Sequence, residues 1–137
     1  MIFFINHDND AAKTSYVFDQ NGNAHGGAWQ ATSDIRLKKN IERIADPLTK
    51  MQQLRGVTWD RIDDKPSGIG FIAQEVQAVF PDAVSVSHDS MEIPGGKVDN
   101  VLSLNAGNVA AALHHEAILA LMEKVEQLEA ELAELKG

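Results

Sequence analysis

The side chains that could act as nucleophiles are hydroxyls, because the 137 residues include no cysteine. A serine hydroxyl reacts near neutral pH only when a base takes its proton. Ser33 and Lys38 are a candidate pair, and nearby cations that would favour a neutral lysine are Arg36, Lys39 and Arg43. Five residues of separation place the two side chains on opposite faces of a strand and well apart around a helix. They can therefore meet only across a bend or between subunits, and by spacing alone a turn or cap serine is the commoner explanation.

Other reactive groups give weaker indications. His114 and His115 are adjacent, so on a helix their rings point about a hundred degrees apart and cannot chelate one metal ion together. A surface pair, or one histidine lying in the approach to a coiled coil, is the expected role. The sequence has no phosphate-binding loop, metal motif or pocket-forming pair of carboxylates. We therefore expect no metal and no cofactor, and an enzyme acting on an outside substrate is poorly supported.

Charge and hydropathy exclude further classes. The hydrophobic fraction of 44% and a mean hydropathy of -0.21 are typical of a folded globular protein. A net charge of -8 disfavours nucleic acid as a partner, because binding to phosphates needs a positive surface. The apolar run at residues 1–5 is far too short for a signal peptide or a membrane span, so no membrane partner is expected.

The first third predicts short strands. Residues 2–5 and 15–18 are apolar or β-branched, and Asn21-Gly22 is a turn signal suited to positive φ. Two short strands cannot bury a core alone, so we interpret residues 1–29 as the end of a longer β-rich body. Residues 31–41 alternate apolar and polar side chains, which predicts a half-exposed strand.

The middle third predicts a small mixed α/β unit. A short helix begins with Asp46 as N-cap and Pro47 at its first position, and ends near residues 54–56. A second helix has its apolar face in residues 72–80 and ends before Pro81. Strands are expected at 57–59, 84–86 and 98–104, with a loop at 63–68 and a turn at 94–96.

The last third has a heptad pattern. Its apolar residues alternate steps of three and four and form a coiled-coil seam, namely Ile118, Leu121, Val125, Leu128, Leu132 and Leu135. Lys124 and Glu129, and likewise Glu131 and Lys136, are placed to pair across parallel chains. The alternative is an amphipathic helix packed on its own domain, because three heptads make a short coil. By the usual rule, β-branched residues at one core position with leucine at the other lean toward two strands.

Three separated motifs resemble one family. They are Thr32-Ser33-Asp34-Ile35-Arg36-Leu37-Lys38-Lys39-Asn40-Ile41, then Leu54-Arg55-Gly56-Val57-Thr58-Trp59, then Gly70-Phe71-Ile72-Ala73-Gln74-Glu75-Val76 with Phe80-Pro81. In this order, with a coiled coil after them, they look like the intramolecular chaperone domain of phage endosialidases, tail fibres and tail spikes. The resemblance covers about residues 31–137. The chain departs from the family's lead into the coil, where it carries Asn105-Ala106-Gly107-Asn108.

The resemblance implies an α+β fold with residues 1–32 as the distal end of a fibre stalk and 33–137 as the chaperone. Within the chaperone, 33–104 would be the small α/β unit and 105–137 the helix of a parallel trimeric coiled coil. The homotrimer would guide folding of the upstream stalk of its own chain and then cut itself free between Thr32 and Ser33. Ser33 would be the nucleophile and Lys38 the base of this serine peptidase, with Arg36 or Asn40 as an oxyanion or positioning group.

The resemblance also implies a location. The precursor of a virion tail fibre would be made in the cytoplasm of the bacterial host, and the chaperone fragment would be released after cleavage. The main alternative is a structural trimerisation tip that stays on the fibre and never cleaves.

Overall fold

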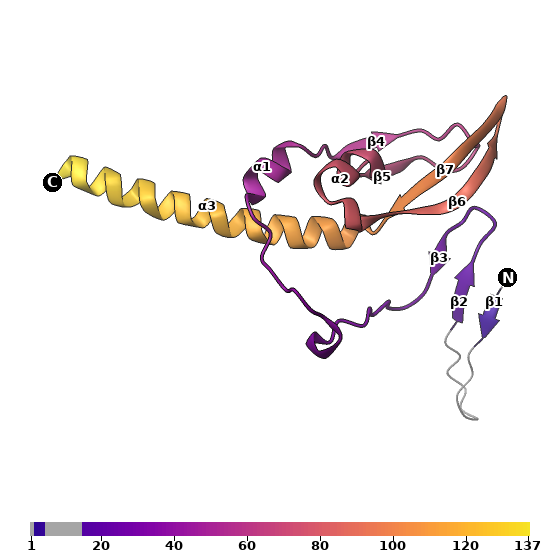
Figure 1. Ribbon diagram of the computed structural model, residues 1–137, viewed down its shortest axis with the longest axis horizontal. Coiled ribbons are helices and arrows are strands. Elements are labelled where there is room, and N and C mark those ends of the chain that lie inside the picture. Colours follow the sequence, from indigo (N-terminus) through magenta and orange to yellow (C-terminus); the bar gives the residue numbers. More distant parts are fainter. Residues whose placement is uncertain (1, 5–14) are drawn as a thin grey trace. The chain divides into compact units, whose positions relative to one another are not determined.

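The chain has the α+β class that the sequence predicts, with short strands, short helices and one long helix at the end (Figure 1). The computed structural model describes residues 2–4 and 15–137. Contacts within the chain divide it into two compact units, Met1–Ile41 and Glu42–Gly137. Each unit is treated separately below as unit 1 and unit 2.

Unit 1 contains a three-stranded antiparallel sheet. Its strands are β1 (Ile2–Phe4), β2 (Ser15–Phe18) and β3 (Ala24–His25), in that order across the sheet. The strands expected at 2–5 and 15–18 are thus confirmed, except that residue 5 lies outside the described residues. Gly22 has φ +85°, which confirms the turn predicted between β2 and β3.

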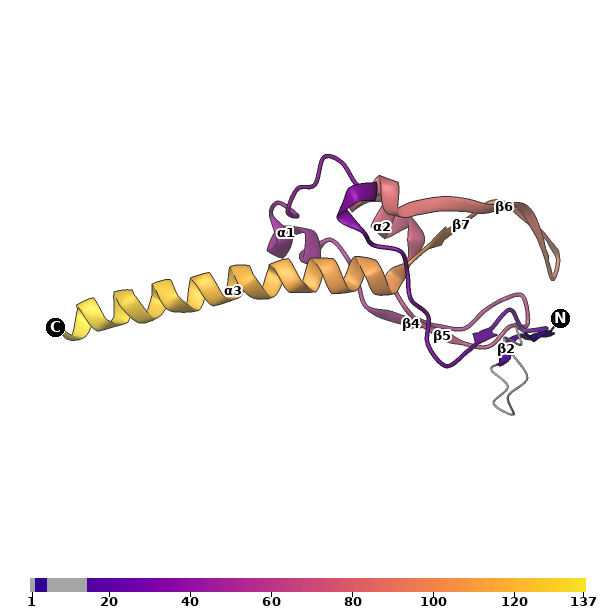
Figure 2. The ribbon, with the colours of Figure 1, turned by 90° about the horizontal axis from the view of Figure 1, so that it is seen from below.

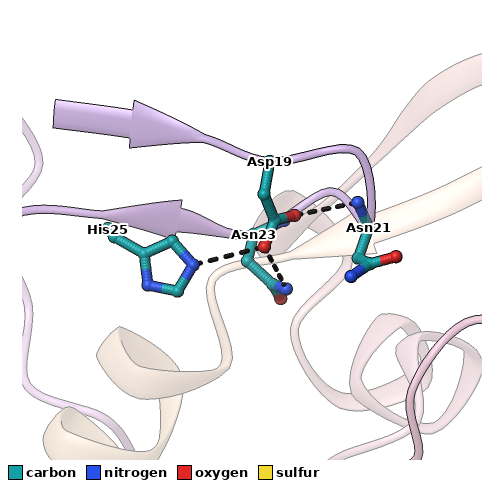
Figure 3. A network of polar contacts seen from close by, with 4 residues as sticks. All are labelled: Asp19, Asn21, Asn23 and His25. Carbon is teal, nitrogen blue, oxygen red and sulfur yellow. Dashed lines mark hydrogen bonds and ion pairs between the residues drawn. The ribbon is translucent and has the colours of Figure 1, made fainter. Parts of the chain in front are cut away.

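One aspartate organises that turn (Figure 3). Asp19 Oδ1 accepts hydrogen bonds from the backbone N–H groups of Asn21 at 2.8 Å and Asn23 at 2.9 Å. Asp19 Oδ2 accepts from Asn23 Nδ2 at 2.9 Å and lies 3.3 Å from His25 Nε2. These bonds favour the charged carboxylate and hold the pKa of Asp19 far below its usual range.

The strand expected at residues 31–41 is wrong. The segment has no ladder partner among the described residues, and Ile35–Leu37 instead form a single 3₁₀ turn. The side chain of Asp34 accepts a hydrogen bond from the backbone N–H of Arg36, which stabilises a turn at the expense of an extended chain. Ile35 and Leu37 are both exposed, so no packing opposes the turn.

Unit 2 contains the remaining elements. In chain order they are α1 (Pro47–Gln52), β4 (Val57–Trp59), β5 (Gly68–Gly70), α2 (Ala73–Val79), a 3₁₀ turn (Pro81–Ala83), β6 (Val84–Ile93), β7 (Gly96–Leu104) and α3 (Ala106–Lys136). β4 pairs with β5 and β6 with β7, both antiparallel. The predicted helices and strands of the middle third are therefore confirmed in type, while β6 extends well beyond residue 86.

The starts of two helices differ in how they are capped. The capping role expected of Asp46 is wrong, because this residue has φ 50° and its side chain makes no capping hydrogen bond. Pro47 is nevertheless the first helical residue, as expected. Asn105 caps α3, since its Oδ1 accepts a hydrogen bond from the backbone N–H of Asn108 at 3.0 Å.

The core of unit 2 is small and lies where α3 begins. Its buried apolar side chains are Val76 of α2 and Leu113 and Ala117 of α3. The first half of α3 runs beside α1, whereas its second half extends away from the rest of unit 2 (Figures 1 and 2). In the part of the chain that the structure describes, no helix is both long and apolar enough to cross a membrane.

Candidate active site

Ser33 and Lys38 lie together across the 3₁₀ turn. Lys38 Nζ donates a hydrogen bond to Ser33 Oγ at 2.6 Å. The turn between them is closed by two backbone bonds, from Leu37 N to Asp34 O at 3.1 Å and from Lys38 N to Ile35 O at 3.0 Å. A bend within one chain is thus sufficient to bring together side chains that neither a strand nor an α-helix could join.

Asp34 and Arg36 brace the same turn. Asp34 Oδ1 accepts from the backbone N–H of Arg36 at 2.8 Å and from its Nε at 3.0 Å, and Oδ2 accepts from Nη2 at 2.6 Å. The guanidinium and the backbone N–H hold the pKa of Asp34 below its usual range, and the carboxylate raises the pKa of Arg36. The guanidinium of Arg36 is therefore engaged at the side of the turn, where it positions the backbone between Ser33 and Lys38.

The pair is open to solvent in a single chain. Thr32, Ser33, Lys38 and Asn40 are all exposed. Asn40 has a left-handed backbone conformation with φ 51°, so the chain turns again just after Lys38. A hydroxyl, an amine and a bent backbone in contact are the elements of a serine–lysine peptidase, and water reaches all of them.

Two of the sequence motifs are joined by an ion pair in unit 2. Arg55 Nε donates to Glu75 Oε1 at 2.9 Å, and the backbone N–H of Arg55 donates to Glu75 Oε2 at 3.3 Å. The arginine lowers the pKa of Glu75. This contact ties the segment before β4 to α2 across twenty residues of sequence, so both residues support the fold of the α/β unit.

The six residues of the predicted seam do not pack on the other elements of unit 2. Their exposed fractions lie between 50% and 85%, while Leu113 and Ala117 on a neighbouring face of α3 are each 1% exposed. The seam residues are Ile118, Leu121, Val125, Leu128, Leu132 and Leu135. An amphipathic helix folded on its own domain would bury these side chains, so this alternative does not describe α3.

One groove of unit 2 is mostly apolar. A groove of about 580 Å³ between β4, β5 and the start of α3 is lined by residues that carry no ionisable side chain. Its walls include Val57, Ile69, Phe71 and Ala110. Within residues 2–4 and 15–137 of one chain, no cluster of three or more histidine or acidic residues could hold a metal ion.

Sequence reasoning missed the roles of Asp34 and of the Arg55–Glu75 pair. An aspartate that precedes a turn and lies two residues before an arginine is a signal for an Asx-type turn, and this signal was available for Asp34. Nothing in the spacing of Arg55 and Glu75 indicates a contact, because they are twenty residues apart in the sequence and β4 and β5 lie between them.

Comparison with known proteins places these features in a family. Residues 33–85 match a peptidase family described as "Chaperone of endosialidase". The match begins at Ser33 and includes Lys38, Arg55 and Glu75, which form the serine–lysine contact and the ion pair above.

Phage fibre proteins are relatives of the chain. The long tail fiber protein Gp37 of Enterobacteria phage K3 is 35% identical over 105 residues, which cover 73% of this chain and 8% of that protein. Gp37 of Enterobacteria phage T2 is also 35% identical over 105 residues, covering 73% of this chain and 7% of the fibre protein. Gp37 of Salmonella phage S16 is 30% identical over 113 residues, covering 77% and 14%. The chain thus spans a small part of the length of these relatives. It carries a domain of the endosialidase-chaperone peptidase family and is homologous to phage long tail fibre proteins.

Proposed function

We propose that residues 33–137 are an intramolecular chaperone that trimerises through α3, starts folding of a tail fibre stalk upstream, and then cuts the chain between Thr32 and Ser33. Residues 1–32 would be the end of that stalk, and the intact protein a precursor of a virion component. The observation that carries the proposal is the 2.6 Å contact between Lys38 Nζ and Ser33 Oγ at the first residues of the family match.

The proposed reaction needs no cofactor. Ser33 Oγ attacks the carbonyl carbon of Thr32, and Lys38 in its neutral form accepts the hydroxyl proton. The bond from Thr32 C to Ser33 N breaks, Lys38 returns the proton to that nitrogen, and Thr32 is left as an ester on Ser33 Oγ. Water then hydrolyses the ester, which releases a carboxylate on Thr32 and a free hydroxyl on a new N-terminal Ser33. Backbone N–H groups or the amide of Asn40 would stabilise the oxyanion, and Arg36 would position the turn.

Assembly provides a reason for timed cleavage. In one chain the Ser33–Lys38 contact is exposed to water. Burial or added positive charge around the pair in a trimer would favour the neutral base. Cutting would then report that three chains have assembled.

The proposed chaperone action is nucleation. When one coiled coil holds three chain ends together, the effective concentration of each end near the others is roughly millimolar. This offsets the entropy cost of closing the first contacts of a triple-stranded β-structure. No ATP and no groove for foreign clients are required.

Mass spectrometry of freshly folded protein tests the cleavage. We expect a fragment of residues 33–137, which Ser33→Ala and Lys38→Met abolish and which Lys97→Met, the control at an exposed lysine of β7, leaves unchanged. Both inactive variants should remain full-length and assemble as the native chain does. Cutting at Thr32–Ser33 in Ser33→Ala would show that another group is the nucleophile.

The same measurement separates the structural alternative. An intact 137-residue chain that has nevertheless assembled into trimers would favour a permanent tip of a fibre. The exposed seam of α3 supports assembly in both cases, so the oligomer alone does not discriminate between them.

A further inference from the structure

The exposed stripe of α3 continues before the predicted seam. Stepping back from Ile118 by four, three and four residues reaches His114, Ala111 and Gly107, and all four positions are exposed. His114 therefore repeats at seven-residue intervals with Leu121, Leu128 and Leu135, at the same core position of the heptad. His115 lies about a hundred degrees around the helix, away from the stripe.

The surroundings of His114 leave its nitrogens free to bind. Leu113 beside it is 1% exposed and anchors this turn of α3 in the core of unit 2. The ring of His114 makes an edge contact with Phe71, at a centroid distance of 6.4 Å and an interplanar angle of 86°. Neither ring nitrogen has a hydrogen-bond partner among the residues that the structure describes. The imidazole is thus held from one side by an aromatic ring, with both nitrogens unengaged.

We propose that three His114 imidazoles meet on the axis of the trimer and bind one divalent transition-metal ion of the zinc or nickel class. The inference rests on the proposed function, because one chain supplies a single ligand. Imidazole nitrogens are preferred ligands of these ions, and three of them leave a fourth position for water. Ala111, one turn before His114, is small enough to leave room for that water. A vacant site would instead bury three polar rings without partners, which is unfavourable.

Titration of the metal-free protein tests the site. The chain, without any affinity tag, is treated with EDTA, dialysed, and titrated with zinc chloride in a calorimeter near neutral pH, and its mass is measured by light scattering in the same buffer. We expect one zinc ion per three chains, complete loss of this binding in His114→Ala, and unchanged binding in His115→Ala. His114→Leu should trimerise through an apolar core position yet bind no zinc, which keeps the test valid if the alanine variant fails to assemble.

Each outcome is decisive. A trimer that takes up no zinc at one ion per three chains, or whose binding survives in His114→Leu or is lost in His115→Ala, overturns the metal site and leaves the proposed trimer standing. A chain that stays monomeric overturns the trimer and the metal site together. As a second readout, zinc should raise the melting temperature of the native trimer and leave that of His114→Leu unchanged.

Discussion

Asp34 shapes the candidate active site although it takes no part in the proposed chemistry. Its carboxylate accepts from the backbone N–H of Arg36 and pairs with the guanidinium of the same residue. Both contacts fix the turn that brings Ser33 and Lys38 together. Asp34 is therefore a positioning residue, and its two contacts can be separated by substitution.

We expect Asp34→Asn to cleave more slowly than the native chain and Asp34→Ala more slowly still. Asparagine keeps an oxygen that accepts from the N–H of Arg36 but loses the ion pair, whereas alanine loses both. The rate is measured by gel densitometry after refolding, and Asp46→Ala is the matched control because the side chain of Asp46 caps no helix. Equal rates for native, Asn and Ala chains would remove Asp34 from the site.

The lowered pKa of Asp34 gives a second test. The charged form is favoured in the folded turn, so its contribution is complete above the ordinary value of 3.8 and is lost only as the pH falls through the lower folded value. We expect NMR titration of the Asp34 carboxyl carbon to show a midpoint below 3.8 in the native chain and a return toward 3.8 in Arg36→Ala. A midpoint unaffected by Arg36→Ala would show that the ion pair does not form in solution.

The site could be anticipated only in part from the residues. The separation of Ser33 and Lys38 indicates that a bend is required, and the structure contains a bend there. The apolar alternation of Ile35 and Leu37 nevertheless imitates a strand. A period of two cannot reveal that neither side chain is buried, because burial depends on contacts with the rest of the fold. It also takes no account of the competing turn that Asp34 stabilises.

At the scale of elements, α3 has a buried part in its first half and an exposed apolar stripe in its second half. Leu113 and Ala117 anchor its first half in the core of unit 2, and the heptad residues remain exposed along its second half.

Asn105 caps the N-terminus of α3, so we expect Asn105→Ala to lower the free energy of unfolding by about 1 kcal/mol. Thermal or urea unfolding measures this, with Asn108→Ala as a control that keeps the backbone donor. A loss in the control as large as in Asn105→Ala would contradict the capping role.

The heptad face predicts a sharp difference between two charges placed two residues apart, about 200° around the helix. Leu128→Asp puts a carboxylate at a core position and should give monomers, because three buried like charges repel one another. Ala130→Asp puts the same charge on the outer face and should leave the oligomer intact. Sedimentation equilibrium at several concentrations distinguishes the two, and assembly of Leu128→Asp would show that the seam is not the interface.

The elements themselves were mostly readable from pattern. Apolar residues at helical and alternating spacing predicted α1, α2, β4 and β7 because local periodicity and packing agree there. Asp46 makes no capping hydrogen bond, and its backbone adopts φ 50°, whereas a capping residue usually has an extended backbone. Strand length in β6 was also missed, since polar residues in a two-stranded hairpin need no buried face.

At the scale of the whole molecule, the heptad pattern does not determine how many chains assemble. β-branched and leucine positions lean toward two strands, whereas the family resemblance implies three. The chain also spans only 7–14% of the fibre proteins that it resembles. In the proposed function, assembly acts on a fibre chain upstream, and cleavage would be a direct readout of that assembly.

We expect self-cleavage to require the trimer. When the native chain is refolded at increasing concentration, the first-order rate should rise until the chains are assembled and then become independent of concentration. Leu128→Asp should cleave at least about tenfold more slowly at every concentration, since loss of about 1.4 kcal/mol of transition-state stabilisation suffices for that factor. Ala130→Asp should follow the native curve. A monomeric Leu128→Asp chain that cuts itself at the native rate would mean that the turn of Ser33 and Lys38 is complete in one chain, and that cleavage does not report assembly.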